Sequence, residues 1–305
     1  MRVGAIDLGS NSTRLLVADV ADGHVDEVER ALVITRLGEG VDTGRRLLPL
    51  PVARVRNVLA DFRRTLDGLG AERTLAVATS AVRDAENGEA FLGEIEWSYG
   101  FATALLSGED EAALTLRGVG AGRTLEPGTL IVDIGGGSTE LIQTVPGTVK
   151  EASLDLGCVR LTERFGDDVD AAGEYVCAHL PDLDMRAAIG VAGTITSLAT
   201  LDLGLVEHDP ERVHGHRLAT VAVEEQLARL AALPLEERRR VPGLDPERAP
   251  VIVAGAVILR EVLRRYGLEE IEVSEHDLLH GAALAAAELP EAAEGEAPPG
   301  ASTCC

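Results

Sequence analysis

The stretch VDIGGGSTELI (residues 132–142) decides the fold of this chain, because the chain contains it twice. Its earlier counterpart is IDLGSNSTRLL (residues 6–16). The residues that recur at the same places in the later copy are Asp7, Gly9, Ser12, Thr13 and Leu15. Each copy has apolar residues, a turn of small polar residues, and then alternating apolar residues, which predicts two strands joined by a tight turn. The chain therefore uses one strand-turn-strand unit twice.

Length and hydrophobic content are those of a folded protein with two domains. The 305 residues can form two cores of ordinary size, and 46% of them are hydrophobic. No apolar run approaches the roughly 20 residues that a membrane-spanning helix needs. The N-terminus begins a strand and shows no apolar signal region. We therefore expect a cytoplasmic protein without a membrane segment.

Strand and helix patterns alternate around the two copies. An amphipathic helix is predicted over residues 51–70, a buried strand over 74–79, and a further helix from about Ser107. A glycine-rich stretch then separates this helix from the second copy. The domains are placed at 1–123 and 124–288, with a disordered acidic tail at 289–305 and a last helix, from about residue 274, that packs back on the first domain. This order predicts two mixed α/β domains that face one another across a cleft.

Charge and aromatic content exclude several classes of partner. The formal net charge of −23 argues against nonspecific binding to nucleic acid or to an anionic membrane, since both require a basic surface. Aromatic residues make up only 3% of the chain, so it has no platform on which single-stranded bases could stack. The four cysteines are too few and too scattered for a disulfide framework, and we expect reduced thiols.

The repeated turns have the composition of a phosphate-binding site. A turn of small residues exposes successive backbone N–H groups that can bind phosphate oxygens. The candidate phosphate-binding residues of the two turns are Ser10, Asn11, Ser12, Gly135, Gly136, Gly137 and Ser138. A plain hairpin turn is the alternative, but packing alone would repeat apolar residues, whereas the repeated set is Asp, Gly, Ser and Thr. Two such turns would hold an oligophosphate from both sides.

The acidic residues beside the turns point to a cation. Asp7 and Asp133 end the first strand of each copy, where a carboxylate next to phosphates commonly reaches a hydrated Mg²⁺ ion. One position differs in charge, because Arg14 in the first copy is replaced by Glu140 in the second. An arginine on one side and a metal-binding carboxylate on the other suit a polyanion that carries Mg²⁺.

Seven motifs in sequence order resemble the exopolyphosphatase and guanosine pentaphosphate phosphohydrolase (Ppx/GppA) family. They are IDLGSNSTRLL, VATSAVRD, SGEDEA, VDIGGGSTEL, LGCVRLTERF, VAGTITSLA and SEHDLLHGAAL. The resemblance covers residues 1 to about 288 and is nearest to the short actinobacterial forms, without the additional helical HD-type domain of longer relatives. It implies two actin-like domains of the ribonuclease H-like, sugar kinase, heat-shock protein and actin superfamily, and a homodimer.

The resemblance also implies roles for individual residues. It makes Glu111 the base that directs the attacking water, although Asp110 departs from the Glu that the family motif has there; favourable charge at a helix N-terminus is the alternative for this acidic run. Asp133 and Glu140 become ligands or near-ligands of Mg²⁺. Arg83 would contact the scissile phosphate, against the alternative of a surface salt bridge with Asp84.

Two further sites were weighed on the residues alone. Gly193 and Thr194 follow a predicted strand and open a helix, whose first N–H groups are a ready anion site; a plain strand-to-helix turn is the alternative. The pairs His214/His216 and His276/His280 suggest a metal site. We do not predict one, because no Cys or acidic partner completes a zinc-like spacing. Instead Ser274 and Asp277 have the spacing of a capping pair that starts the last helix.

The predicted activity is Mg²⁺-dependent hydrolysis of the terminal phosphoanhydride of inorganic polyphosphate. The strong negative charge should repel a very long polyanion, which favours short chains. Conversion of guanosine pentaphosphate to the tetraphosphate is a same-chemistry alternative. Two others stay open: a weakly catalytic sensor of guanosine polyphosphates or ATP, and an ATP-dependent kinase.

Overall fold

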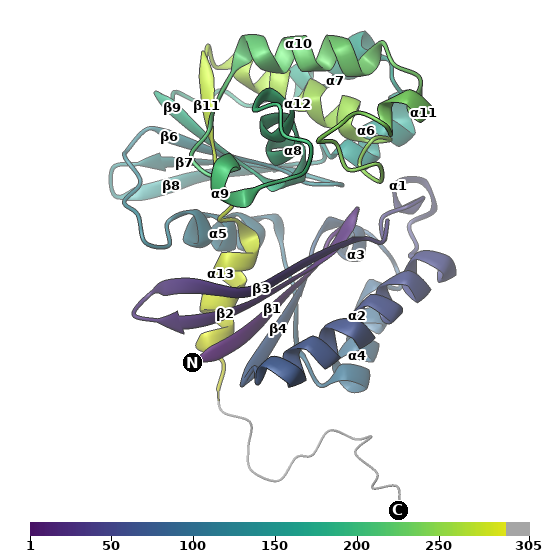
Figure 1. The fold of residues 1–305 in the computed structure, drawn as a ribbon, viewed down its shortest axis with the longest axis vertical. Helices are drawn as coiled ribbons and strands as arrows, with labels where there is room; N and C mark the ends of the chain where they lie inside the picture. The colour runs from purple at the N-terminus through teal and green to yellow at the C-terminus, as the bar shows by residue number, and fades with distance from the viewer. Residues whose placement is uncertain (291–305) are drawn as a thin grey trace, which may run out of the picture. The chain divides into compact units, whose positions relative to one another are not determined.

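The computed structural model describes residues 1–290 and divides them into two compact units (Figure 1). Among the described residues, the first unit comprises residues 1–107 and 278–290, and the second comprises Gly108–Asp277. The boundary lies earlier than residue 123, because the helix from Gly108 buries Ala112 and Val119 in a cluster of the second unit. Most of the predicted disordered tail lies outside the described residues.

The first unit contains a five-stranded sheet in the order β3-β2-β1-β4-β5. Strand β1 pairs antiparallel with β2 and parallel with β4. The elements of this unit are β1 (Arg2–Leu8), β2 (Ser12–Ala21), β3 (His24–Ile34), α1 (Val41–Gly44), α2 (Pro49–Leu69), β4 (Arg73–Ala78), α3 (Ser80–Arg83), α4 (Gly88–Tyr99), β5 (Ala102–Leu105) and α13 (Leu278–Ala287).

The second unit contains a six-stranded sheet in the order β10-β11-β9-β6-β7-β8. Its elements are α5 (Gly108–Val119), β6 (Thr129–Ile134), β7 (Thr139–Val145), β8 (Thr148–Leu154), α6 (Cys158–Phe165), α7 (Val169–His179), β9 (Ala187–Val191), α8 (Ala192–Asp202), α9 (Pro210–Val213), β10 (Arg217–Ala219), α10 (Thr220–Ala231), α11 (Leu235–Arg238), α12 (Ile252–Arg265) and β11 (Glu270–Val273).

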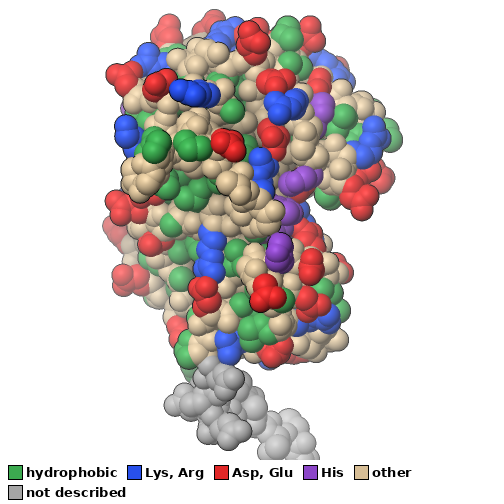
Figure 2. Space-filling view, turned by 90° about the vertical axis from the view of Figure 1, so that its left-hand side faces the viewer, with side chains coloured by type: hydrophobic (Ala, Val, Ile, Leu, Met, Phe, Trp, Pro, Cys, Tyr) green, Lys and Arg blue, Asp and Glu red, His purple; other side chains and the backbone are tan. Residues whose placement is uncertain are grey.

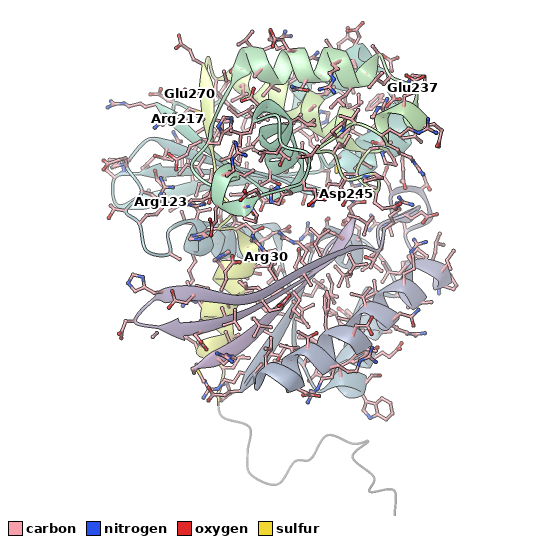
Figure 3. All side chains as sticks on the ribbon, viewed as in Figure 1. Arg30, Arg123, Arg217, Glu237, Asp245 and Glu270 are labelled. Carbon is pink, nitrogen blue, oxygen red and sulfur yellow. The ribbon has the colours of Figure 1, made fainter. Side chains whose placement is uncertain are left out.

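The two sheets repeat one topology. The run β3-β2-β1-β4-β5 has the same order and directions as β8-β7-β6-β9-β11, with β10 added antiparallel at the edge beside β11. In Figure 3 the labelled Arg217 and Glu270 mark this added edge, where their side chains form an ion pair. The chain thus has two actin-like domains, and the predicted duplication of a strand-turn-strand unit is confirmed.

Each sheet is covered on both faces, and strand periodicity sorts its residues between them. In the first unit Ile6, Leu8 and Leu15 belong to the cluster formed with α2 and α4, while α13 contacts β1, β2 and β4. In the second unit Leu130 and Val132 belong to the large cluster with α8 and α12, whereas α5 covers Ile131 and Ile142 on the other face. In the second unit, the alternation of residues between the two sheet faces therefore determines which side chains contact α5.

Two expectations about element boundaries differ from the structure. A third strand at the sheet edge follows each hairpin, β3 in the first unit and β8 in the second. The sequence analysis did not predict β3, because its residues are largely polar and exposed. The last helix begins at Leu278 rather than at Ser274. The Ser274 hydroxyl donates to the His276 carbonyl and accepts from the His276 N–H in a local turn, and so does not cap the helix. Within residues 1–290, no helix is both long and apolar enough to cross a membrane.

Candidate active site

Three acidic side chains of the second unit come together from α5, β6 and β7. Asp133 and Glu140 are register partners in the β6–β7 ladder. They share the sheet face of Ile131 and Ile142, which α5 covers, because alternate residues of a strand point the same way. Glu111 lies in the first turn of α5 and is buried, and its charge acts on Glu140. The sheet and its covering helix therefore create a buried cluster of carboxylates.

Hydroxyl groups hold this cluster in place. Thr115, one helical turn after Glu111, donates to Asp133 Oδ2 at 3.2 Å and so ties α5 to β6. Ser153 of β8 donates to Glu140 Oε1 at 2.9 Å. Sequence reasoning missed both hydroxyls; the i+4 spacing from Glu111 was the available signal for Thr115, whereas Ser153 required the strand register.

The pKa of Glu140 is strongly shifted. Its side chain is fully buried, and burial is the main cause that raises its pKa well above the ordinary range for a glutamate. The negative charges of Glu111 and then Asp133 raise the pKa further, while interactions with the Ser153 and Ser138 hydroxyls lower it. Oε2 is buried with no hydrogen-bond donor at bonding distance. The ionised carboxylate therefore needs a positive charge that residues 1–290 do not bring to Oε2.

The cluster fits Mg²⁺ as a partial ligand set. Among the described residues no group of three or more His, Cys, Asp or Glu side chains forms a ready metal shell. Mg²⁺ usually keeps several waters and takes only one or two protein carboxylates beside substrate phosphates. The unsatisfied Glu140 Oε2 beside Asp133 offers ligands of that kind.

The glycine turn between β6 and β7 is built into the start of α6. The Gly135 N–H closes the turn on the Ser138 carbonyl at 3.0 Å. Turn carbonyls then accept from the first N–H groups of α6: Cys158 N donates to Gly135 O at 3.0 Å, and Val159 N to Gly136 O at 2.8 Å. These bonds use the carbonyl side of the turn, so the N–H groups of Gly136 and Gly137 are not the atoms that hold α6.

The predicted pair Gly193 and Thr194 lies in the first turn of α8, which follows β9 directly. Ala192 has φ 68°, a left-handed conformation that costs a non-glycine residue free energy and is common at functional sites. The guanidinium of Arg248 lies over Gly193, since a side chain there would meet Arg248 Nη1 at 1.4 Å. Its charge also acts on the buried Cys158 thiol. Sequence reasoning missed Arg248, because one arginine in an arginine-rich chain carries no signal.

The candidate residues of the first unit gather around the equivalent turn. Gly9 N donates to Ser12 O at 3.0 Å, the same closure as in the second copy. Asn11 is the residue whose carbonyl accepts from the N–H groups of Thr35 and Arg36. The Ser10 hydroxyl lies 2.9 Å from the Ser80 hydroxyl at the start of α3. This contact joins the turn to the short helix that ends at Arg83.

Asp7 and Arg14, also register partners, form an ion pair in the first copy. Both Nε and Nη2 of Arg14 lie 2.8 Å from Asp7 Oδ2. The sequence analysis assigned Asp7 to a metal and Arg14 to phosphate, but here the guanidinium supplies the positive charge next to the aspartate. This ion pair involves Asp7 Oδ2 only, and the metal role of Asp7 stays a prediction.

Arg83 is held near the end of β5. It is half-buried, and its Nη1 donates to the Leu106 carbonyl at 2.8 Å. This bond holds one nitrogen of the guanidinium in place. Within their own units, therefore, the structure brings together two sets of predicted residues.

Histidines of the second unit form a separate group. The rings of His214 and His276 have centroids 4.9 Å apart, and His208 Nε2 lies 3.1 Å from Glu275 Oε1. His280, four residues after His276, belongs to the first unit and pairs with Glu27 at 3.0 Å. The helical spacing of His276 and His280 therefore does not create a site, since only the second of them lies in α13.

Comparison with known proteins identifies the family. The model of the Ppx/GppA phosphatase family matches residues 16–288. Exopolyphosphatase 2 of Mycobacterium tuberculosis is 37% identical over 314 residues, which cover 94% of this chain and 98% of that protein. The chain belongs to the Ppx/GppA phosphatase family. The sequence-based prediction of this family is thus confirmed.

Solved Ppx/GppA structures have the same fold. The Aquifex aeolicus member of the family is 30% identical, with a TM-score of 0.78 over 94% of this chain and 97% of that one. An exopolyphosphatase from Cytophaga hutchinsonii is 26% identical, with a TM-score of 0.83 over 92% of this chain and 96% of that one. The chain is therefore similar to Ppx/GppA proteins over nearly its whole folded length.

Proposed function

We propose that the protein is an exopolyphosphatase that requires Mg²⁺, removes the terminal phosphate of inorganic polyphosphate and prefers short chains. Membership of a phosphatase family supports hydrolysis, and the similarity to exopolyphosphatase 2 supports the substrate. The observation that carries the proposal is the buried cluster of Glu111, Asp133 and Glu140 beside the glycine turn. A homodimer, implied by the resemblance, is part of the proposal.

The proposed roles follow from the chemistry of a terminal phosphoanhydride. Hydrolysis requires a water held in line and compensation of charge on the transferred phosphoryl group. Glu111 would orient the water and accept its proton. Asp133 and Glu140 would hold Mg²⁺, which when bound neutralises phosphate charge. Thr115 keeps Asp133 in place by its hydrogen bond.

Phosphate groups of the substrate would contact the turns and the arginines. The N–H groups of Gly136 and Gly137, with the Ser138 hydroxyl, suit one phosphate group. The start of α8 at Gly193 and Thr194, together with the Arg248 guanidinium, suits another. In the first unit the turn at Ser10, Asn11 and Ser12 and the side chains of Arg14 and Arg83 complete the proposed set.

The test is phosphate release by purified protein with Mg²⁺. Tripolyphosphate, long-chain polyphosphate and guanosine pentaphosphate are compared for wild type and Glu111→Gln. We expect the variant to lower kcat by about 100-fold or more, the usual effect of losing a general base, while it still binds tripolyphosphate. Glu109→Gln is the matched control, because Glu109 is an exposed neighbour in the same helical turn.

The outcomes separate the alternatives. Exclusive hydrolysis of guanosine pentaphosphate would reassign the substrate with the same chemistry. Tight binding of guanosine polyphosphates without phosphate release would favour a sensor, and release that depends on an acceptor and consumes ATP would favour a kinase. Removal of divalent cations with EDTA should stop phosphate release, and added Mg²⁺ should restore it.

A further inference from the structure

Arg238 in α11 is the most deeply buried cation of the second unit among the described residues. Only 1% of its side chain is exposed, and every nitrogen of its guanidinium donates a hydrogen bond. Nη1 and Nη2 bind Asp167 Oδ1 and Oδ2 at 3.1 and 2.8 Å in a bidentate pair. The remaining bonds go to the carbonyls of Leu230, Leu233 and Ala249.

A buried arginine of this kind adds little net free energy to folding, because its desolvation opposes the gain from its contacts. Removing a guanidinium from water costs several kcal/mol even when it is paired, and an apolar side chain of similar volume often serves stability as well. What an arginine adds is geometry, since its planar fork fixes several partners relative to one another. The hydrogen-bond partners of Arg238 therefore indicate which parts of the structure it holds in position.

The partners lie next to two parts of the candidate site. Ala249, whose carbonyl accepts from Nη1 at 3.2 Å, directly follows Arg248 in the chain. Asp167 lies just after α6, the helix whose first N–H groups bind the carbonyls of the glycine turn. Arg238 thus links the segment that carries Arg248 to the helix that supports the phosphate turn of residues 135–137.

The backbone around Arg248 is held at both ends. The Arg248 N–H donates to the Asp245 carbonyl at 2.9 Å. The Arg248 carbonyl accepts from the N–H groups of Val251 and Ile252 at the start of α12. The bond from Arg238 holds the next carbonyl along the chain, that of Ala249. Figure 3 labels Asp245, at the beginning of this turn, and Glu237, the chain neighbour of Arg238 on α11. The Arg248 side chain leaves this segment to lie over Gly193.

We propose that Arg238, oriented by Asp167, is a positioning residue that fixes the Arg248 guanidinium over Gly193 at the start of α8. The inference rests on the proposed function, because it assigns Arg248 to substrate phosphate. Arg238 does not touch the substrate in this account. Its loss frees the Ala249 peptide, so the Arg248 guanidinium is no longer held where it would bind a phosphate oxygen.

The experiment compares Arg238→Met, Arg238→Lys and Arg248→Gln with the double variant Arg238→Met/Arg248→Gln. Steady-state kinetics with tripolyphosphate and Mg²⁺ give KM and kcat, and thermal unfolding gives Tm. We expect Arg238→Met to raise KM about 10-fold while kcat changes less than about threefold, as for lost ground-state binding. Arg238→Lys keeps the charge but loses the fork, so KM should rise as well.

The double variant distinguishes positioning from a general structural role. If Arg238 acts through Arg248, the double variant has the KM of Arg248→Gln alone, although its Tm falls further. Arg260→Met is the matched stability control, because Arg260 forms a largely buried ion pair with Glu261 elsewhere in the second unit. It should lower Tm without raising KM.

A milder variant covers the case in which Arg238→Met does not fold. Asp167 is half-exposed at its side chain, so Asp167→Asn removes the counter-charge without opening a cavity, and we expect KM to rise about two- to fivefold. Unchanged KM in Asp167→Asn and Arg238→Lys, or additive KM effects in the double variant, would overturn the inference.

Equilibrium binding separates this inference from the proposed function. Calorimetry of tripolyphosphate binding is run with the same variants whether or not phosphate is released. If wild type binds tripolyphosphate without hydrolysing it, the proposed activity fails, while weaker binding by the Arg238 variants still supports the positioning role. If wild type does not bind tripolyphosphate, both fail.

Discussion

At the scale of single residues, the two copies of the repeated unit differ most in charge. Asp7 faces Arg14 in one ladder and Asp133 faces Glu140 in the other, at the same register. The first pair neutralises itself as an ion pair, whereas the second leaves two carboxylates side by side with Glu111 near them. The exchange of Arg14 for Glu140 between the copies thus replaces an ion pair by two carboxylates, whose charge a bound cation would neutralise.

Glu140→Gln should make the metal-free protein more stable and less active. A neutral amide removes the burden of a buried charge next to two carboxylates, and we expect the free energy of unfolding in EDTA to rise by roughly 1 to 2 kcal/mol. Mg²⁺ should then stabilise the variant much less than wild type, and phosphate release should fall. Urea unfolding with and without Mg²⁺ measures this, with the exposed Glu151→Gln as control. Lower stability of Glu140→Gln in EDTA would contradict the account.

Cys158 should make wild type lose stability in alkali. Burial raises the pKa of its thiol to about 11, although the Arg248 charge acts in the opposite direction. Between about pH 9 and 11 the unfolded thiol loses its proton while the folded one keeps it, so stability falls as pH rises, by up to about 3 kcal/mol. Cys158→Ala should lack this part of the fall. Free energies of unfolding at pH 8 and pH 10.5 test it; equal losses in both proteins would refute it.

At the scale of elements, α6 is attached to the sheet through the glycine turn. Its first N–H groups bind turn carbonyls in place of a side-chain cap, since Gly157 at its N-cap position has no side chain. The turn and the helix therefore form one structural unit. A change that displaces α6 should also change the phosphate turn.

Gly157→Ala should disrupt this attachment. A methyl group at this position would lie 2.2 Å from the Gly136 carbonyl oxygen, so the helix or the turn must move. We expect a loss of about 2 to 4 kcal/mol in the free energy of unfolding, in line with overpacking against backbone, and a raised KM for tripolyphosphate. Gly93→Ala, in the middle of α4 with open space around it, should instead stabilise by about 0.5 to 1 kcal/mol. Equal effects of the two variants would contradict the packing argument.

At the scale of the whole molecule, the net negative charge of the chain repels a polyphosphate anion. The chain has 51 acidic and 28 basic residues. On the face shown in Figure 2, acidic side chains are spread widely with basic ones between them. A polyphosphate that extends beyond the site would therefore meet a repulsive surface, whereas a short chain would be contained by the turns and arginines.

Salt should improve the binding of long chains. Raising ionic strength from about 20 to 150 mM shortens the screening length from roughly 20 to 8 Å and weakens repulsion of the distant part of the chain. At constant free Mg²⁺ we expect KM for long-chain polyphosphate to fall about two- to fivefold and KM for tripolyphosphate to change less. A KM that rises with salt for the long chain would show net attraction instead.

The sequence by itself determined the repeated strand-turn-strand unit, because strand periodicity and turn composition are local properties of the chain. Its seven motifs indicated the family by resemblance, and the resemblance implied the actin-like fold class. The resemblance also implied a catalytic role for Glu111 and metal-binding roles for Asp133 and Glu140. Only the tertiary structure showed that Asp7 pairs with Arg14, that Thr115 and Ser153 support the carboxylates, and that Arg248 lies over Gly193. These contacts depend on strand register and on helices packing from distant parts of the chain, which no local pattern records.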